Sequence, residues 1–212
     1  MIELFILASA IFGCCHIYFD WQQNHKACYV FKPLTVICMI VYLAIETLTS
    51  ININTNYAFA ILLGLIFSLA GDCFLMLRPQ KFIAGLVSFL IAHIVYCIAF
   101  YNLIDGPLNL TALGIMLIPA LGYYSFLYNS LNKLKIPVAI YVSAILSMAY
   151  LSLSVYQQQG STIALLGFIG ALFFMLSDSL LALNKFKIPF KLAQPAILST
   201  YYLAQWLIVK SV

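Results

Sequence analysis

Eight apolar runs, each close to the length that a helix needs to cross a lipid bilayer, follow one another along this chain. A hydrocarbon core of about 30 Å requires roughly 20 helical residues. The runs cover 2–19, 33–49, 57–77, 82–101, 108–130, 136–156, 162–183 and 192–209. They are continuous rather than alternating in polarity, which excludes a transmembrane β-barrel. We therefore expect an all-α polytopic membrane bundle of about eight transmembrane helices, forming one integral membrane domain over residues 1–212.

The composition excludes a soluble fold. Hydrophobic residues make up 65% of the chain and charged residues only 8%, whereas soluble domains carry roughly 25% charged residues. The net charge of +4 comes from bases in short loops, so we expect no nucleic-acid partner. The six cysteines lie mostly within apolar runs, and we interpret them as small buried residues rather than metal ligands. No protein partner is required by any feature of the sequence.

The basic residues are divided unevenly between the two sides of the expected bundle. Nine of them occupy the loops after the first, third, fifth and seventh runs: Lys26, Lys32, Arg78, Lys81, Lys133, Lys135, Lys185, Lys187 and Lys191. The opposite side holds only Lys210. By the positive-inside rule, these odd-numbered loops are cytoplasmic and both termini lie outside. We expect an integral protein of a bacterial inner membrane.

An internal similarity relates the two halves of the chain. At an offset of 106 residues, the segment 67–77 around Asp72 aligns with the segment 173–183 around Asp178. Four helices separate the two, so the orientation is kept and the similarity predicts a parallel repeat with halves 1–105 and 106–212. Chance likeness between leucine-rich helices is the alternative.

Asp72 and Asp178 are acids within apolar runs, each five residues before the end of its run. A charged residue in the hydrocarbon costs about 2.5–3.5 kcal/mol on insertion scales, so such residues usually line a cavity. If the third and seventh helices were neighbours, the two carboxyl groups would approach each other. Mutual repulsion would then keep one protonated, which supplies a general acid beside a general base. The alternative is two separate acids, each hydrogen-bonded locally.

Other polar residues are candidates for binding a substrate in the same region. Lys32, which precedes the second apolar run, either holds a phosphate or anchors the helix at the interface. His93 either assists proton transfer or is an ordinary buried histidine. The remaining candidates are Tyr96, Ser177, Tyr201, Tyr202 and Gln205. None of the three histidines is spaced i, i+4 from another, so the spacing predicts neither a metal site nor a cofactor.

Several short motifs occur together in a fixed order. They are Lys32-Pro33, Gly71-Asp72-x-x-Leu75, Gly85…Phe89…His93-x-x-Tyr96, Phe174-x-x-Ser177-Asp178 and Tyr201-Tyr202-x-x-Gln205. With its eight runs, the chain resembles the YhhN-like lysoplasmalogenase family over nearly its whole length. The resemblance implies a membrane-embedded hydrolase that cleaves the vinyl ether bond of lysoplasmalogens, giving a fatty aldehyde and a glycerophospho-ethanolamine or -choline. It also implies that the two aspartates are central.

The chemistry of the residues agrees with that reaction. A vinyl ether is hydrolysed by proton transfer to carbon, and an aspartate dyad would divide acid and base roles much as two carboxylates do in glycoside hydrolysis. The expected partners are a lysophospholipid substrate and membrane lipid, with no metal. A proton-coupled transporter is the alternative function, because paired intramembrane acids in a parallel-repeat bundle also suit a carrier.

Overall fold

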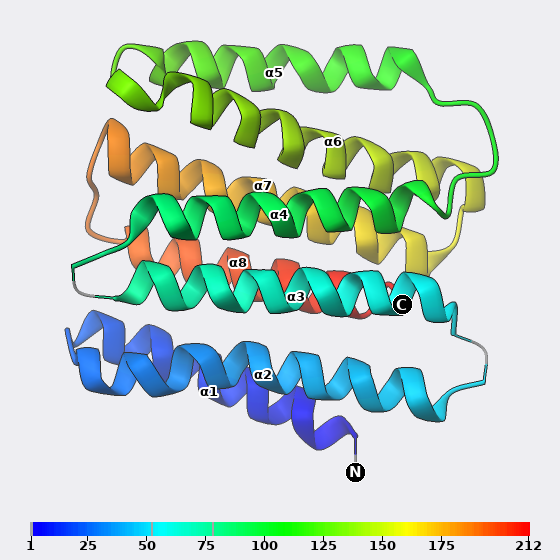
Figure 1. Ribbon diagram of the computed structural model, residues 1–212, viewed down its shortest axis with the longest axis horizontal. Coiled ribbons are helices and arrows are strands. Elements are labelled where there is room, and N and C mark those ends of the chain that lie inside the picture. The colour runs from blue at the N-terminus through cyan, green and yellow to red at the C-terminus, as the bar shows by residue number, and fades with distance from the viewer. Residues whose placement is uncertain (1, 52, 78) are drawn as a thin grey trace.

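The computed structural model describes residues 2–51, 53–77 and 79–212, and over these ranges it is an all-helical bundle (Figure 1). Arg78, which the charge count above includes, lies outside the described residues, as does Asn52. The helices are α1 (Glu3–Trp21), α2 (His25–Thr49), α3 (Thr55–Met76), α4 (Phe82–Tyr101), α5 (Leu110–Tyr128), α6 (Lys135–Gln159), α7 (Thr162–Phe186) and α8 (Ala193–Val209). A short 3₁₀ turn, Asn132–Leu134, precedes α6. The predicted fold class is confirmed.

Seven of these helices, α1 to α7, are long and apolar enough to cross a membrane. The last, α8, has 17 residues, which at 1.5 Å per residue gives a length of about 25 Å. Side-chain caps fix four helix beginnings: Asn24, Asn54, Asn109 and Ser161 each accept a hydrogen bond from the backbone N–H three residues on. Such caps satisfy donors that the helix itself leaves unpaired. The chain is therefore an integral membrane protein built from helices.

The beginning of the second helix differs from the expectation. We expected Lys32-Pro33 to open this helix, but α2 begins at His25 and contains Pro33 in its interior. The prediction was wrong because it treated a charged residue as a boundary. Lys32 is instead buried and paired with Asp72, so the helix continues past it. Proline is tolerated within membrane helices where neighbouring groups compensate for the missing backbone hydrogen bond.

Consecutive helices pack in antiparallel pairs, and the two halves join through the middle of the bundle (Figure 1). The closest pairs are α3 with α4, α7 with α8, and α1 with α2, while α4 with α6 and α1 with α8 connect the halves. Among the described residues, α3 and α7 do not form a closely packed pair. Asp72 and Asp178 therefore do not meet at a direct contact between their own helices. The predicted repeat stays a prediction.

Glycine allows the close approach of α3 and α4 that positions two aromatic rings. A Cβ atom on Gly64 would stand 2.1 Å from the Tyr96 ring, and one on Gly71 would stand 2.7 Å from the Phe89 ring. Small residues at such contacts let membrane helices pack tightly. Both Tyr96 and Phe89 are buried as a result, and Phe89 lies directly beside the site described next.

The connections that follow α1, α3, α5 and α7 all lie at one end of the bundle, on the left in Figure 1. The two termini lie toward the opposite end. Of the described basic residues that the sequence assigned to these loops, Lys81, Lys133, Lys187 and Lys191 lie in the connections, whereas Lys26, Lys32, Lys135 and Lys185 lie within the adjoining helices near the same end. Which side of a membrane this end faces stays a prediction.

Candidate active site

A polar chamber of about 330 Å³ opens among the helices near the end that carries the basic connections. It lies where α1, α3 and α7 finish and α2 and α8 begin. Its polar and charged lining is unusual for a membrane bundle and, among the described residues, consists of His16, Asp20, His25, Cys28, Tyr29, Lys32, Asp72, Gln80, Ser177, Asp178, Gln194 and Tyr201. Five of the predicted site residues, Lys32, Asp72, Ser177, Asp178 and Tyr201, are among them.

Asp72 is held by an ion pair and a hydrogen bond. Its Oδ1 atom lies 3.0 Å from Nζ of Lys32, and its Oδ2 atom accepts a hydrogen bond of 2.7 Å from the Tyr201 hydroxyl. The side chain of Asp72 is only 2% exposed. A buried carboxylate with a cation and a hydroxyl donor has the partners that a buried charge requires.

A chain of hydrogen bonds extends from Asp72 into the bundle. Gln205 donates to the Tyr201 hydroxyl over 3.2 Å, and its own carbonyl oxygen accepts from the Tyr96 hydroxyl over 2.9 Å. Gln205 and Tyr96 are fully buried and do not line the chamber. These two predicted substrate-binding residues therefore lie outside the chamber and extend the hydrogen-bond network of Asp72. Gln205 orients the Tyr201 hydroxyl, and Tyr96 orients Gln205.

Asp178 has different partners. Its Oδ2 atom accepts a hydrogen bond of 2.5 Å from the Tyr141 hydroxyl and lies 3.7 Å from Nε2 of His93. His93 is fully buried against the rings of Tyr141 and Phe174, and neither of its ring nitrogens has a hydrogen-bond partner among the described residues. His93 therefore lies beside Asp178 at slightly more than hydrogen-bond distance, and a small movement of either side chain would form the bond.

The two remaining predicted site residues, Ser177 and Tyr202, form hydrogen bonds between neighbouring helices. Ser177 donates a hydrogen bond of 2.9 Å to the carbonyl oxygen of Ile197, which joins α7 to α8. The Tyr202 hydroxyl lies 2.7 Å from Nδ1 of His16, on the side of α8 that faces α1. Tyr202 thus contacts α1 rather than either aspartate.

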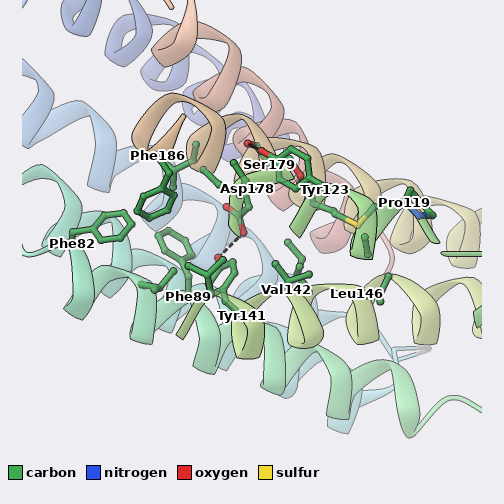
Figure 2. Close-up of a pocket in the computed structure, with 18 of the residues that line it drawn as sticks. Phe82, Phe89, Pro119, Tyr123, Tyr141, Val142, Leu146, Asp178, Ser179 and Phe186 are labelled. Carbon is green, nitrogen blue, oxygen red and sulfur yellow. Dashed lines mark hydrogen bonds between the residues drawn. The ribbon is translucent and has the colours of Figure 1, made fainter. Parts of the chain in front are cut away.

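A second chamber, of about 350 Å³, adjoins the first and is almost wholly apolar (Figure 2). It lies between α4, α5, α6 and α7, and Figure 2 shows Phe82, Phe89, Pro119, Val142 and Leu146 along its walls. Within the part of the chain that the structure describes, four residues line both chambers: Leu75, Phe89, Asp178 and Leu181. Asp178 therefore marks the place where a polar and an apolar space meet.

The sequence reasoning missed two features of this region. Tyr141 lies on α6, and no spacing links it to Asp178. The second feature is a group of possible metal ligands: one atom each from His16, Asp20 and Cys28, all within 4.8 Å of one another. The i, i+4 spacing of His16 and Asp20 was visible in the sequence, but only the turn between α1 and α2 brings Cys28 beside them.

The fold and the two chambers define a polytopic helical membrane protein with one buried acid, Asp72, and one partly buried acid, Asp178, where a polar and an apolar space meet. The sequence model of the YhhN family matches residues 27–212, and the chain belongs to this family.

Its similarity to individual proteins extends over almost the whole chain. It is 32% identical to lysoplasmalogenase TMEM86A of Bos taurus, over 93% of this chain and 84% of that protein. It is also 32% identical to lysoplasmalogenase TMEM86B of Sus scrofa, over 96% of this chain and 85% of that protein. The uncharacterized membrane protein YhhN of Escherichia coli O157:H7 is 24% identical, over 90% and 87%. No solved structure matches the chain.

Proposed function

We propose that this protein is a lysoplasmalogenase that hydrolyses the vinyl ether bond of single-chain lysophospholipids within the membrane. The observation that carries the proposal is the meeting of two chambers of opposite polarity at one partly buried carboxyl group, that of Asp178. The names of the two lysoplasmalogenase relatives support a hydrolase rather than the transporter alternative.

The two chambers suit the two ends of the proposed substrate. The polar chamber, with Lys32 on its wall, would take the phosphate and the polar head group. The apolar chamber would take the alkenyl chain, since aromatic and branched aliphatic side chains form its walls. The vinyl ether joins these two parts of the molecule, so it would lie at the junction beside Asp178.

The surroundings of the two aspartates suggest how they divide the chemistry. Asp72 has a cation partner in Lys32, and we assign it the role of the ionised base. Asp178 borders the apolar chamber and has a tyrosine hydroxyl rather than a lysine beside it, and we assign it the role of the acid. The assignment separates two roles that the sequence left open.

The proposed reaction begins when Asp178 gives its proton to the vinyl carbon that is not bonded to oxygen. The π electrons form the new C–H bond, and the neighbouring carbon becomes an oxocarbenium ion. Water bonds to that carbon and loses a proton to the Asp72 carboxylate. The resulting hemiacetal returns its hydroxyl proton to Asp178, while Asp72 protonates the departing glycerol oxygen. The products are a fatty aldehyde and a glycerophospho-alcohol, and both acids regain their starting states.

We also propose that the polar chamber faces the cytoplasm in a bacterial inner membrane. The chamber lies near the end of the bundle where the basic connections gather, and loops rich in lysine and arginine stay on the cytoplasmic side. The water-soluble product would then leave on that side. A cysteine introduced next to Lys191 should react with a membrane-impermeant reagent only after the cells are opened.

The test of the proposed function uses purified full-length protein in detergent and two substrates that differ in one bond. A lysoplasmalogen should release aldehyde, whereas the matched lysophospholipid with an acyl ester should release no fatty acid. Glu46→Gln provides a control, because Glu46 borders a different cavity near the opposite end of the bundle. Release of fatty acid from the ester, or no aldehyde from the vinyl ether, would contradict the proposal.

A further inference from the structure

Three side chains of different ligand classes converge at the wall of the polar chamber. His16 and Asp20 lie one turn apart on α1, and Cys28 lies in the first turn of α2. A ring nitrogen, a carboxylate oxygen and a sulfur atom from these residues lie within 4.8 Å of one another. From the geometry we infer that these three side chains form a binding site for a zinc-class divalent ion.

The ligand set fits this class of ion. Zinc binds imidazole nitrogen, thiolate sulfur and carboxylate oxygen at about 2.0–2.3 Å, which places ligand atoms about 3.3–3.8 Å apart at tetrahedral angles. Small side-chain rotations would bring the three atoms from their present separations to these distances. Harder ions such as Mg²⁺ and Ca²⁺ prefer sites made of oxygen alone, so the sulfur of Cys28 disfavours them.

The burial and the hydrogen bonding of these side chains suit a metal-binding site. His16 is 3% exposed and Cys28 is 7% exposed. The Tyr202 hydroxyl hydrogen-bonds to Nδ1 of His16 and so fixes the orientation of the ring. Hydrogen bonds of this kind orient metal-binding histidines, and their loss typically weakens metal affinity about 10–100-fold. In this proposal Tyr202, which contacts neither Asp72 nor Asp178, positions the ring of His16.

Three protein ligands leave one position of a tetrahedral ion open. His16, Asp20 and Cys28 all line the polar chamber, so the open position is accessible to a ligand within it. An anionic oxygen such as that of a phosphate would suit the fourth position. The ion would also cross-link the end of α1 to the beginning of α2, because its ligands come from both helices.

One ligand of the proposed site, Cys28, lies within the segment that the YhhN family model matches, and the other two lie before it. The match to the YhhN family begins at residue 27, after His16 and Asp20. The proposed proton transfers use the carboxyl groups of Asp72 and Asp178 alone, so the metal-binding test does not depend on the proposed reaction.

The test titrates the metal-stripped full-length protein with Co²⁺, which reports thiolate ligation through a sulfur-to-metal charge-transfer band. One cobalt should bind per chain, and Zn²⁺ should displace it. Cys28→Ser should remove the band, whereas Cys14→Ser, an exposed cysteine on α1, should keep it. Asp20→Asn, which serves if Cys28→Ser does not fold, should weaken binding at least about tenfold, and Tyr202→Phe about 10–100-fold.

Inorganic phosphate should shift the cobalt d–d bands, because it would enter the open position. Zinc should raise the unfolding temperature of the unmodified protein but not that of Asp20→Asn, since a ligand that binds only the folded state stabilises it. Absence of stoichiometric cobalt binding, or a band that survives in Cys28→Ser, would overturn the site. Unchanged d–d bands with phosphate would overturn the open position.

Discussion

Asp72 and Asp178 align in the predicted repeat, yet their surroundings differ. Asp72 lies in the polar chamber with a lysine 3.0 Å away, and its nearest hydroxyl comes from Tyr201 on α8. Asp178 borders an apolar chamber, and its nearest hydroxyl comes from Tyr141 on α6. Two identical side chains thus meet different electrostatic environments, and this difference is the reason for proposing Asp72 as the base and Asp178 as the acid.

The largest expected effect comes from removing the proposed acid. Asp178→Asn keeps the size of the side chain and a carbonyl oxygen for Tyr141, but it has no acidic proton to donate. General acid catalysis contributes about 10²–10⁴-fold, and we expect a loss of that size in kcat. Steady-state aldehyde formation measures it, with Glu46→Gln as the control. Near-normal kcat in Asp178→Asn would show that Asp178 is not the acid that protonates the substrate.

The pairing of Asp72 with Lys32 should be visible in stability. Lys32→Met leaves a buried carboxylate without its cation, which typically costs about 3–5 kcal/mol in the free energy of unfolding. The double variant Lys32→Met with Asp72→Asn removes both charges and should recover most of this loss. Chemical unfolding in detergent of the unmodified protein, of Lys32→Met, of Asp72→Asn and of the double variant measures the coupling. Equal losses in the single and double variants would show that the ion pair does not hold Asp72.

The apolar chamber should set the preference for chain length. Leu146 lies on its wall five residues beyond Tyr141, which is about 7.5 Å along the helix. Leu146→Trp would fill this part and should lower kcat/KM about tenfold more for a long alkenyl chain than for a short one. Ile140→Trp, on an exposed face of the same helix, is the control. An equal effect on both chains would place the alkenyl chain elsewhere.

The smallest expected effect is that of metal removal on turnover. Because all proton transfers of the proposed reaction use carboxyl groups, EDTA should leave kcat unchanged even when it strips an ion from His16, Asp20 and Cys28. Parallel metal analysis and aldehyde assays on the same sample measure this. A loss of kcat that zinc restores would assign the chemistry to the metal rather than to the aspartates.

Much of this arrangement could be predicted from the sequence, because hydropathy determines which segments can lie in a membrane. The helices followed from the apolar runs, and Asp72 and Asp178 stood out because acids are rare in such runs. The beginning of α2 could not be predicted, since Lys32 is a boundary signal until its partner on α3 is known. Tyr141 and the grouping of Cys28 with His16 depend on how helices pack, which spacing along the chain does not encode.

The measurement that tests the central claim most directly is turnover of a lysoplasmalogen in heavy water. If Asp178 protonates the vinyl carbon, each freshly formed aldehyde must carry one deuterium on the carbon next to the carbonyl. The aldehyde is trapped at once, and unlabelled aldehyde incubated with the enzyme in heavy water serves as the control for exchange. Mass spectrometry should find one carbon-bound deuterium per product molecule. Unlabelled aldehyde would contradict proton transfer to carbon and, with it, the role of the aspartate pair.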